Sequence, residues 1–85
     1  MREFTYVVND PIGIHVRPAG LLVKEVKKFQ STITVTKDGR EVNGLKLMGL
    51  MGLCVKNGEK ITVKADGADE DAAIAALEVF FQENL

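Results

Sequence analysis

The chain's only histidine stands two residues before an arginine, in the segment Gly13-Ile14-His15-Val16-Arg17-Pro18-Ala19. Apolar residues then recur at helical spacing and predict a helix over about residues 16–28, with His15 at its start. Unpaired backbone N–H groups make a helix N-terminus favourable for an anion. An imidazole can also hold a phosphoryl group covalently, and a guanidinium pairs well with phosphate oxygens. Taken alone, the segment fits a phosphate-carrying His15 or a solvated, capping one.

Composition indicates one small globular domain spanning residues 1–85. The chain is 46% hydrophobic and 27% charged, and it has a single cysteine, Cys54, so no internal disulfide is possible. One histidine and one cysteine argue against a zinc site, and we predict neither metal nor cofactor. No segment reads as a signal peptide or membrane span, so the expected location is cytoplasmic, without membrane insertion.

Charge is distributed unevenly along the chain. Residues 1–64 carry a net +5, whereas residues 65–85 carry six acidic side chains and no basic one. Such an asymmetry serves solubility and helix dipoles in many proteins, and it also provides surfaces that attract charged partners.

Hydrophobic periodicity predicts an α+β fold. Strands are expected over residues 4–8, 32–36, 41–43 and 60–65, with long helices over 16–28 and after Asp69. We expect Asp69 to cap the last helix, and Ala72, Ala73, Ile74, Ala76, Leu77, Phe80 and Phe81 to form its apolar stripe. One apolar face per element predicts an open-faced βαββαβα sandwich, a four-stranded antiparallel sheet with helices packed on one face.

The segment 45–53 is too apolar for a typical loop, and it contains more glycine than a typical helix. We expect a helix of one or two turns in which Leu50 and Leu53 complete the core. Leu47, Met48 and Met51 are then partly exposed and form an adaptable contact surface.

The His15-Val16-Arg17-Pro18-Ala19 motif, the Leu47-Met48-Gly49-Leu50-Met51 segment and the element order resemble the HPr family over essentially all 85 residues. HPr proteins are histidine-containing phosphocarriers of the bacterial phosphoenolpyruvate-dependent sugar phosphotransferase system. The resemblance implies that His15 accepts a phosphoryl group on Nδ1 from phospho-enzyme I and passes it to the A domains of sugar-specific enzymes II. A carrier of this kind is not a stand-alone enzyme, and nothing requires more than a monomer.

The same resemblance assigns the neighbouring residues. The phosphate would lie beside the backbone amides of Val16 and Arg17, with the Arg17 guanidinium closing on it, and this positive field disfavours an imidazolium. The partner interface would comprise Gly20, Lys24, Lys27, Lys46, Leu47, Met48 and Met51.

Two positions depart from the family pattern. Lys46 stands where many relatives carry a serine that a kinase phosphorylates, so that regulatory role is not carried over. The only serine, Ser31, lies elsewhere, before the second strand. Cys54 replaces a frequent glycine, and we expect a small buried side chain there.

Other function classes fit less well. A regulatory module on the same fold would dock partners without carrying phosphate, but the resemblance implies that such members lack the histidine. Nucleic acid is not expected as a partner, because the basic residues are not interleaved with aromatic ones. A stand-alone enzyme is not expected, because no second general base lies near His15 in the sequence and the chain is too small to enclose a substrate.

Overall fold

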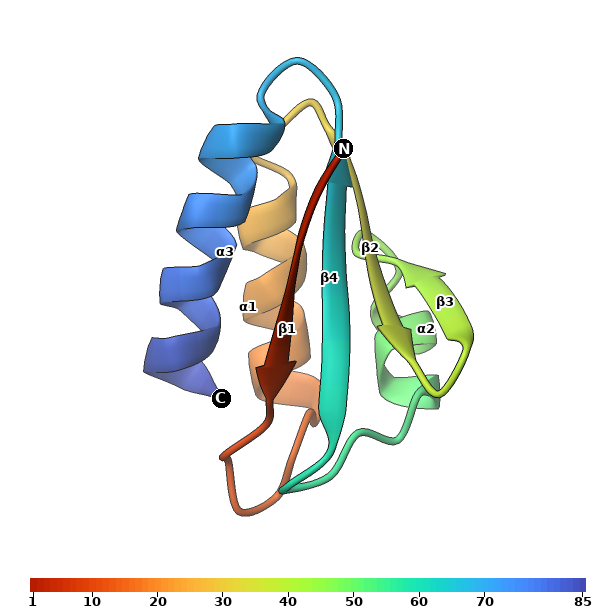
Figure 1. The fold of residues 1–85 in the computed structure, drawn as a ribbon. Coiled ribbons are helices and arrows are strands. Elements are labelled where there is room, and N and C mark those ends of the chain that lie inside the picture. The colour runs from red at the N-terminus through yellow and green to blue at the C-terminus, as the bar shows by residue number, and fades with distance from the viewer.

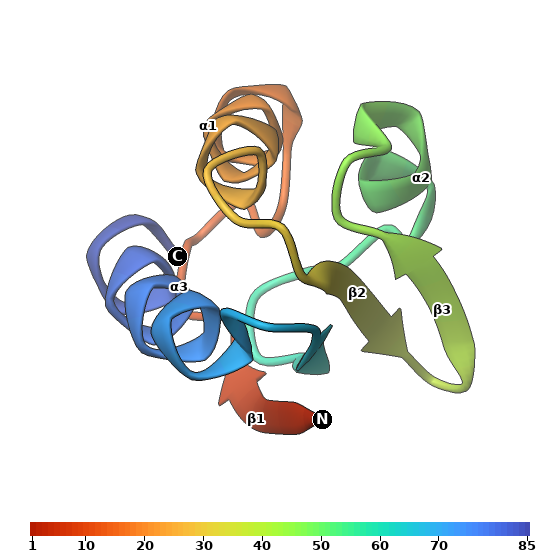
Figure 2. The same ribbon diagram turned by 90° about the horizontal axis from the view of Figure 1, so that it is seen from above.

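The computed structural model describes residues 1–85, and its helices and strands follow the predicted order. They are β1 (Arg2–Val7), α1 (Val16–Val26), β2 (Thr32–Lys37), β3 (Arg40–Asn43), α2 (Leu47–Gly52), β4 (Lys60–Asp66) and α3 (Glu70–Asn84). The strands form one antiparallel sheet in the order β1-β4-β2-β3. All three helices lie on one face of this sheet (Figures 1 and 2). The predicted open-faced sandwich is therefore confirmed.

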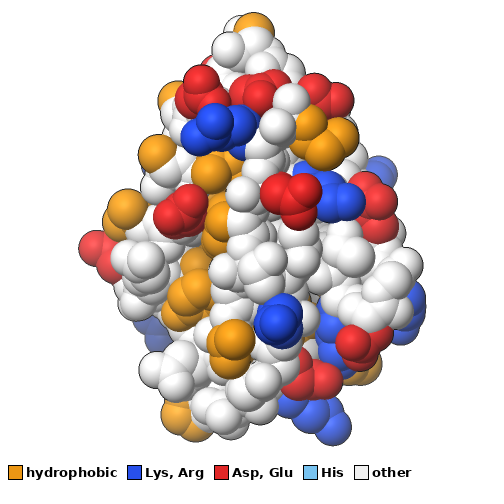
Figure 3. Space-filling view, viewed as in Figure 1, with side chains coloured by type: hydrophobic (Ala, Val, Ile, Leu, Met, Phe, Trp, Pro, Cys, Tyr) orange, Lys and Arg blue, Asp and Glu red, His pale blue; other side chains and the backbone are white.

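Alternation along the central strands divides the sheet into a buried face and an open one. Ile33 and Val35 of β2 and Ile61, Val63 and Ala65 of β4 are buried under the helices, and Val35 pairs directly with Val63. The residues between them point away from the helices, and many are threonine. Figure 3 shows this open face as mostly polar backbone and side chains with scattered charges. The core therefore lies entirely between the sheet and the helices.

Helix α3 covers β1 and β4 through aromatic contacts. The Phe81 ring is fully buried, with its centroid 5.9 Å from that of Phe4 and 5.5 Å from that of Tyr6. Phe80 packs edge-on against Phe81 at 5.8 Å. Ala72, which we predicted to widen the apolar stripe, is exposed, because its position turns toward solvent when the two phenylalanines face the sheet.

Several boundaries differ from the sequence-based prediction. β1 begins at Arg2 rather than at residue 4, because pairing with β4 continues to the Arg2–Ala65 pair. α1 ends at Val26, two residues early. The amides of Lys28 and Phe29 donate to carbonyls three residues back, which tightens the last turn and ends the helix.

Asp69 does not cap α3 through its side chain, and that prediction was wrong. It occupies the N-cap position, but its carboxylate accepts bonds from the amides of Gln30 and Ser31, at 2.8 and 2.9 Å, and from the Ser31 hydroxyl. Asp69 therefore ties the start of α3 to the turn between α1 and β2. The Ser31 side chain is buried by the same contact, with a residue exposure of 7%.

The Asp69 clamp makes stability depend on pH in acid. The Ser31 hydroxyl, then the Gln30 amide, lower the pKa of Asp69 from its ordinary value of 3.8. A carboxyl whose pKa is lower in the folded state stabilises the fold above its unfolded pKa, and this contribution is lost as the pH falls through the folded value. We expect Asp69→Asn to lower the free energy of unfolding at neutral pH and to matter progressively less below pH 3.8.

Urea unfolding at neutral and acid pH measures this difference. The control is Asp38→Asn in the exposed β2–β3 turn, which removes the same charge without removing a clamp. A loss of stability in Asp69→Asn that is equal at both pH values would contradict the assignment.

Candidate functional site

His15 is the N-cap residue of α1. Its backbone is extended, with φ −122° and ψ −176°, and its carbonyl oxygen accepts the first helical bond, 2.9 Å from the Ala19 nitrogen. The amides of Val16 and Arg17 donate to no acceptor in the protein. The imidazole is one-third exposed. The structure therefore places a reachable imidazole beside two unpaired N–H groups, as the sequence predicted.

The loop before α1 holds His15 in place through backbone contacts. The Ile14 amide donates to the Val55 carbonyl at 2.9 Å, and the Ile14 side chain is buried. Gly13 has φ +86°, and a Cβ there would collide with the Val55 carbonyl. Only glycine combines this left-handed backbone with so close an approach. The position of His15 is therefore set by the contacts of Gly13 and Ile14 with Val55, in the loop that precedes β4.

The imidazole opens onto a hollow of about 270 Å³. The lining residues come from helices α1 and α3 and from the loop between β1 and α1, and they are Asp10, His15, Arg17, Pro18, Leu21 and Asn84. None of the ion pairs within the chain uses Arg17, so its guanidinium is available to an anion. The hollow is large enough for a phosphate and too open to enclose a substrate.

Two polar residues of this hollow were missed by the sequence analysis. Asp10 stands five positions before His15, in the turn after the first strand. Its proximity along the chain was the available signal. Asn84 belongs to the last turn of α3, and only the packing of α3 beside α1 brings it here. No sequence pattern links residue 84 to residue 15.

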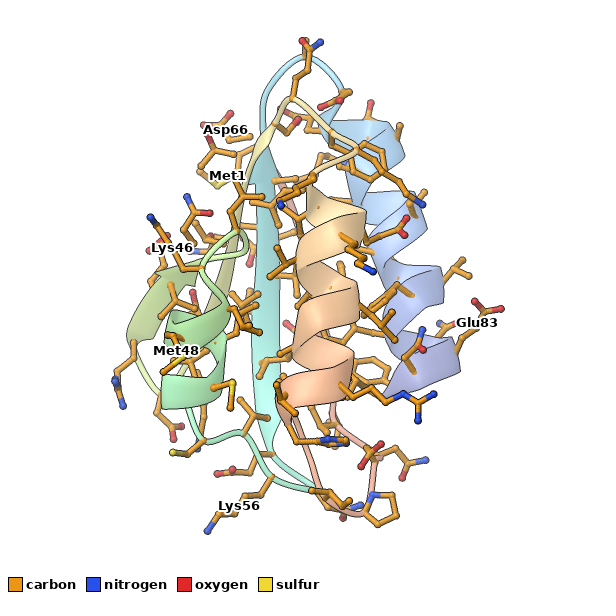
Figure 4. All side chains as sticks on the ribbon, turned by 180° about the vertical axis from the view of Figure 1, so that it is seen from behind. Met1, Lys46, Met48, Lys56, Asp66 and Glu83 are labelled. Carbon is orange, nitrogen blue, oxygen red and sulfur yellow. The ribbon has the colours of Figure 1, made fainter.

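Helix α2 lies beside α1 and presents the apolar residues predicted for an interface. The Met48 side chain projects from α2 (Figure 4), and this residue is 77% exposed. Leu47 and Met51 are half-buried against the core, and Leu50 and Leu53 are buried. The expected division of this segment into buried and partly exposed residues is therefore confirmed.

The remaining predicted interface residues lie on outward positions. Gly20, Lys24 and Lys27 follow Val16 at helical spacing along one side of α1, and a Cβ at Gly20 would meet open space. Lys46 is exposed at the start of α2 (Figure 4). The sequence analysis named Val16 only for its backbone amide and did not name Leu21, which lines the hollow; these residues are 59% and 40% exposed.

Cys54 is exposed, and the prediction of a buried side chain was wrong. Its φ of +53° lies in the left-handed region, which favours glycine. The backbone conformation at this turn after α2, and not packing, explains why glycine suits the position.

No group of three histidine, cysteine, aspartate or glutamate side chains is arranged to hold a metal ion. No helix is long and apolar enough to cross a membrane.

Lys37 secures the end of α2. Its ammonium donates to the carbonyls of Leu53 and Cys54, at 3.2 and 3.1 Å, and lies 3.0 Å from the Glu59 carboxylate. The side chain is only 14% exposed. The hydrogen bond from the Lys37 ammonium to the Glu59 carboxylate is the main cause that lowers the pKa of Glu59. The bond from the Lys56 amide is the second cause. The orphan carbonyls at the helix end are thus satisfied by a cation, which also suits the helix dipole.

Replacement of Lys37 tests this anchor. We expect Lys37→Met to lower Tm by about 4–8 °C, because the two carbonyl bonds are together worth roughly 1 kcal/mol. Thermal unfolding by circular dichroism measures the change. Lys64→Met on the open face of the sheet is the control. Equal Tm values for the two variants would show that Lys37 does not anchor α2.

Comparison with known proteins agrees with this geometry. The family model described as "PTS HPr component phosphorylation site" matches residues 2–83. The phosphocarrier protein HPr of Mycoplasma genitalium is 42% identical over 85 residues, which cover 99% of this chain and 97% of that protein.

Solved structures show the same fold. HPr of Thermoanaerobacter tengcongensis superposes with a TM-score of 0.93 at 40% identity, covering 98% of this chain and 93% of that one. The Bacillus subtilis catabolite repression protein Crh, described as a domain-swapped dimer, superposes with a TM-score of 0.79 at 40% identity. That match covers 92% of this chain and 90% of the other.

Proposed function

The chain belongs to the HPr family of phosphocarrier proteins of the phosphotransferase system, and we propose that His15 is the residue that carries its phosphoryl group. The observation that supports this proposal is an exposed imidazole at the start of α1, beside two backbone N–H groups that have no other partner. No other histidine is present in the chain.

Transfer at this site needs only positioning and charge compensation. The Nδ1 lone pair forms the N–P bond while the bond from phosphorus to the donor breaks, and its electron pair leaves with the donor. The amides of Val16 and Arg17 and the Arg17 guanidinium then donate hydrogen bonds to the phosphate oxygens. Because these donors are in place before the phosphate arrives, little reorganisation is required.

The shape of the site suits a carrier better than an enzyme. A donor and then an acceptor must each approach phosphorus in line, and the shallow hollow leaves that path open. Transient contacts of this kind use small interfaces. We propose enzyme I as the donor and A domains of enzymes II as acceptors in the cytoplasm, with the chain acting as a monomer.

The docking surface in this proposal joins α1 and α2. Met48, Leu47 and Met51 supply its apolar centre, and basic residues surround it. The surrounding residues are Arg17, Lys24, Lys27 and Lys46, with Gly20 permitting close approach. An arrangement of this kind complements an acidic partner surface with an apolar centre.

Similarity to Crh raises a second candidate function, that of a regulatory module that docks without carrying phosphate. The resemblance set out from the sequence assigns that role to members without the histidine. His15 is present here at the start of α1, and its presence supports the carrier function.

Phosphorylation by enzyme I tests the site. The chain is incubated with phosphoenolpyruvate, Mg²⁺ and enzyme I, and its intact mass is measured. We expect one added phosphoryl group that is labile in acid, stable in base and absent from His15→Ala. Arg17→Gln should slow transfer about 10- to 100-fold, because one charged donor to the phosphate is lost.

The matched variant Arg17→Lys retains the charge but lacks the planar guanidinium. Its transfer rate should lie between that of the unaltered chain and that of Arg17→Gln. A phosphoryl group that persists in His15→Ala would refute the assignment of the carrier residue.

Docking is tested separately with Met48→Glu. A buried charge in an apolar contact is unfavourable, so the KM for the chain as substrate of enzyme I should rise about tenfold with little change in kcat. Val79→Glu on α3 is the control, since Val79 is also exposed (52%) but lies on another helix. The same KM for both variants would exclude α2 from the interface.

A further inference from the structure

A carboxylate faces the imidazole of His15 from the loop after β1. Asp10 Oδ1 lies 3.9 Å from His15 Nε2, and both residues line the same hollow. Three-quarters of the Asp10 side chain is buried, with 23% exposed. At this distance the two groups are too far apart for a hydrogen bond but close enough for a direct charge interaction.

Local bonds hold the Asp10 carboxylate in this place. The Ile12 amide donates to Oδ1 at 2.8 Å, and the Gly13 amide donates to the Asp10 carbonyl at 3.0 Å. Asn57 Nδ2 reaches the same carbonyl at 3.2 Å from the loop before β4. The carboxylate is therefore fixed by its own turn and by a second loop, as expected of a group that orients another.

Neutral imidazole carries its proton on one nitrogen only. A carboxylate beside Nε2 favours the proton there, which leaves the lone pair on Nδ1. We propose that Asp10 is a positioning residue that keeps His15 in the Nε2–H tautomer, with Nδ1 ready to attack phosphorus. This inference rests on the proposed role of His15 as the phosphoryl carrier.

The same carboxylate compensates charge during transfer. When the Nδ1 lone pair forms the N–P bond and the donor departs with its electron pair, the Nε2 proton stays on the ring, which gains positive charge. Asp10 lies next to the nitrogen that holds this proton. The other charged side chain that lines the hollow is that of Arg17. Of the two, Asp10 is the one whose carboxylate lies 3.9 Å from Nε2 of the ring.

Asp10→Asn removes the charge and keeps the oxygen that accepts from Ile12, so the turn is retained. The first readout is the tautomer of unphosphorylated His15, taken from ¹⁵N shifts of the ring at a pH where it is neutral. We expect mainly Nε2–H in the unaltered chain, and a three- to fivefold lower Nε2–H to Nδ1–H ratio in Asp10→Asn. Asp66→Asn, about 20 Å away along β4, should leave the ratio unchanged.

The second readout is phosphorylation by enzyme I. We expect kcat for Asp10→Asn to fall three- to tenfold with KM unchanged, because Asp10 acts on the ring and lies outside the docking surface. An Nδ1–H tautomer in the unaltered chain would overturn the proposal, as would a ratio in Asp10→Asn equal to that in Asp66→Asn. Neither result requires phosphorylation. Failure of this inference is therefore distinct from failure of the proposed function, in which His15→Ala would still gain a phosphoryl group.

Discussion

Two backbone N–H groups at the start of α1 have no acceptor in the protein, and the site is organised around them. They belong to Val16 and Arg17. They are unpaired because an N–H group in the first turn of a helix has no carbonyl four residues before it within the helix. The chain reaches this point through the close approach of Gly13 to Val55, which a side chain at residue 13 would prevent. An anion held here meets fixed dipoles, and the imidazole of His15 adjoins them.

The layout of the fold keeps this tip exposed. All three helices cover one face of the sheet, and α1 begins at the end of the molecule where the loops after β1 and before β4 lie (Figure 1). The acidic α3 lies on one side of α1, with Glu83 at its outer surface, and α2 with Lys46 and Met48 lies on the other (Figure 4). The two helices that flank α1 therefore present different surfaces, one with acidic residues and one with exposed apolar and basic residues.

Much of this arrangement could be predicted from residue patterns. Alternation in β2 and β4 identified the buried face, and the spacing of Ala19, Leu22 and Val26 placed His15 at the start of a helix. One error occurred where a side chain found a partner distant in the sequence, and another where the backbone conformation decided the exposure. Asp69 bonds to Ser31 across 38 positions instead of capping its own helix, and the exposure of Cys54 follows from a backbone turn and not from its size.

By itself, the sequence determined the elements, the division of α2 into buried and partly exposed residues, and the position of His15 and Arg17 at the start of α1. These depend on periodicity and on neighbours within a few positions, which are local properties of the chain. Only the tertiary structure decided that Asn84 reaches the hollow and that Lys37 anchors α2. Such contacts join segments whose distance and direction are set by packing of the whole core, and no local pattern encodes them.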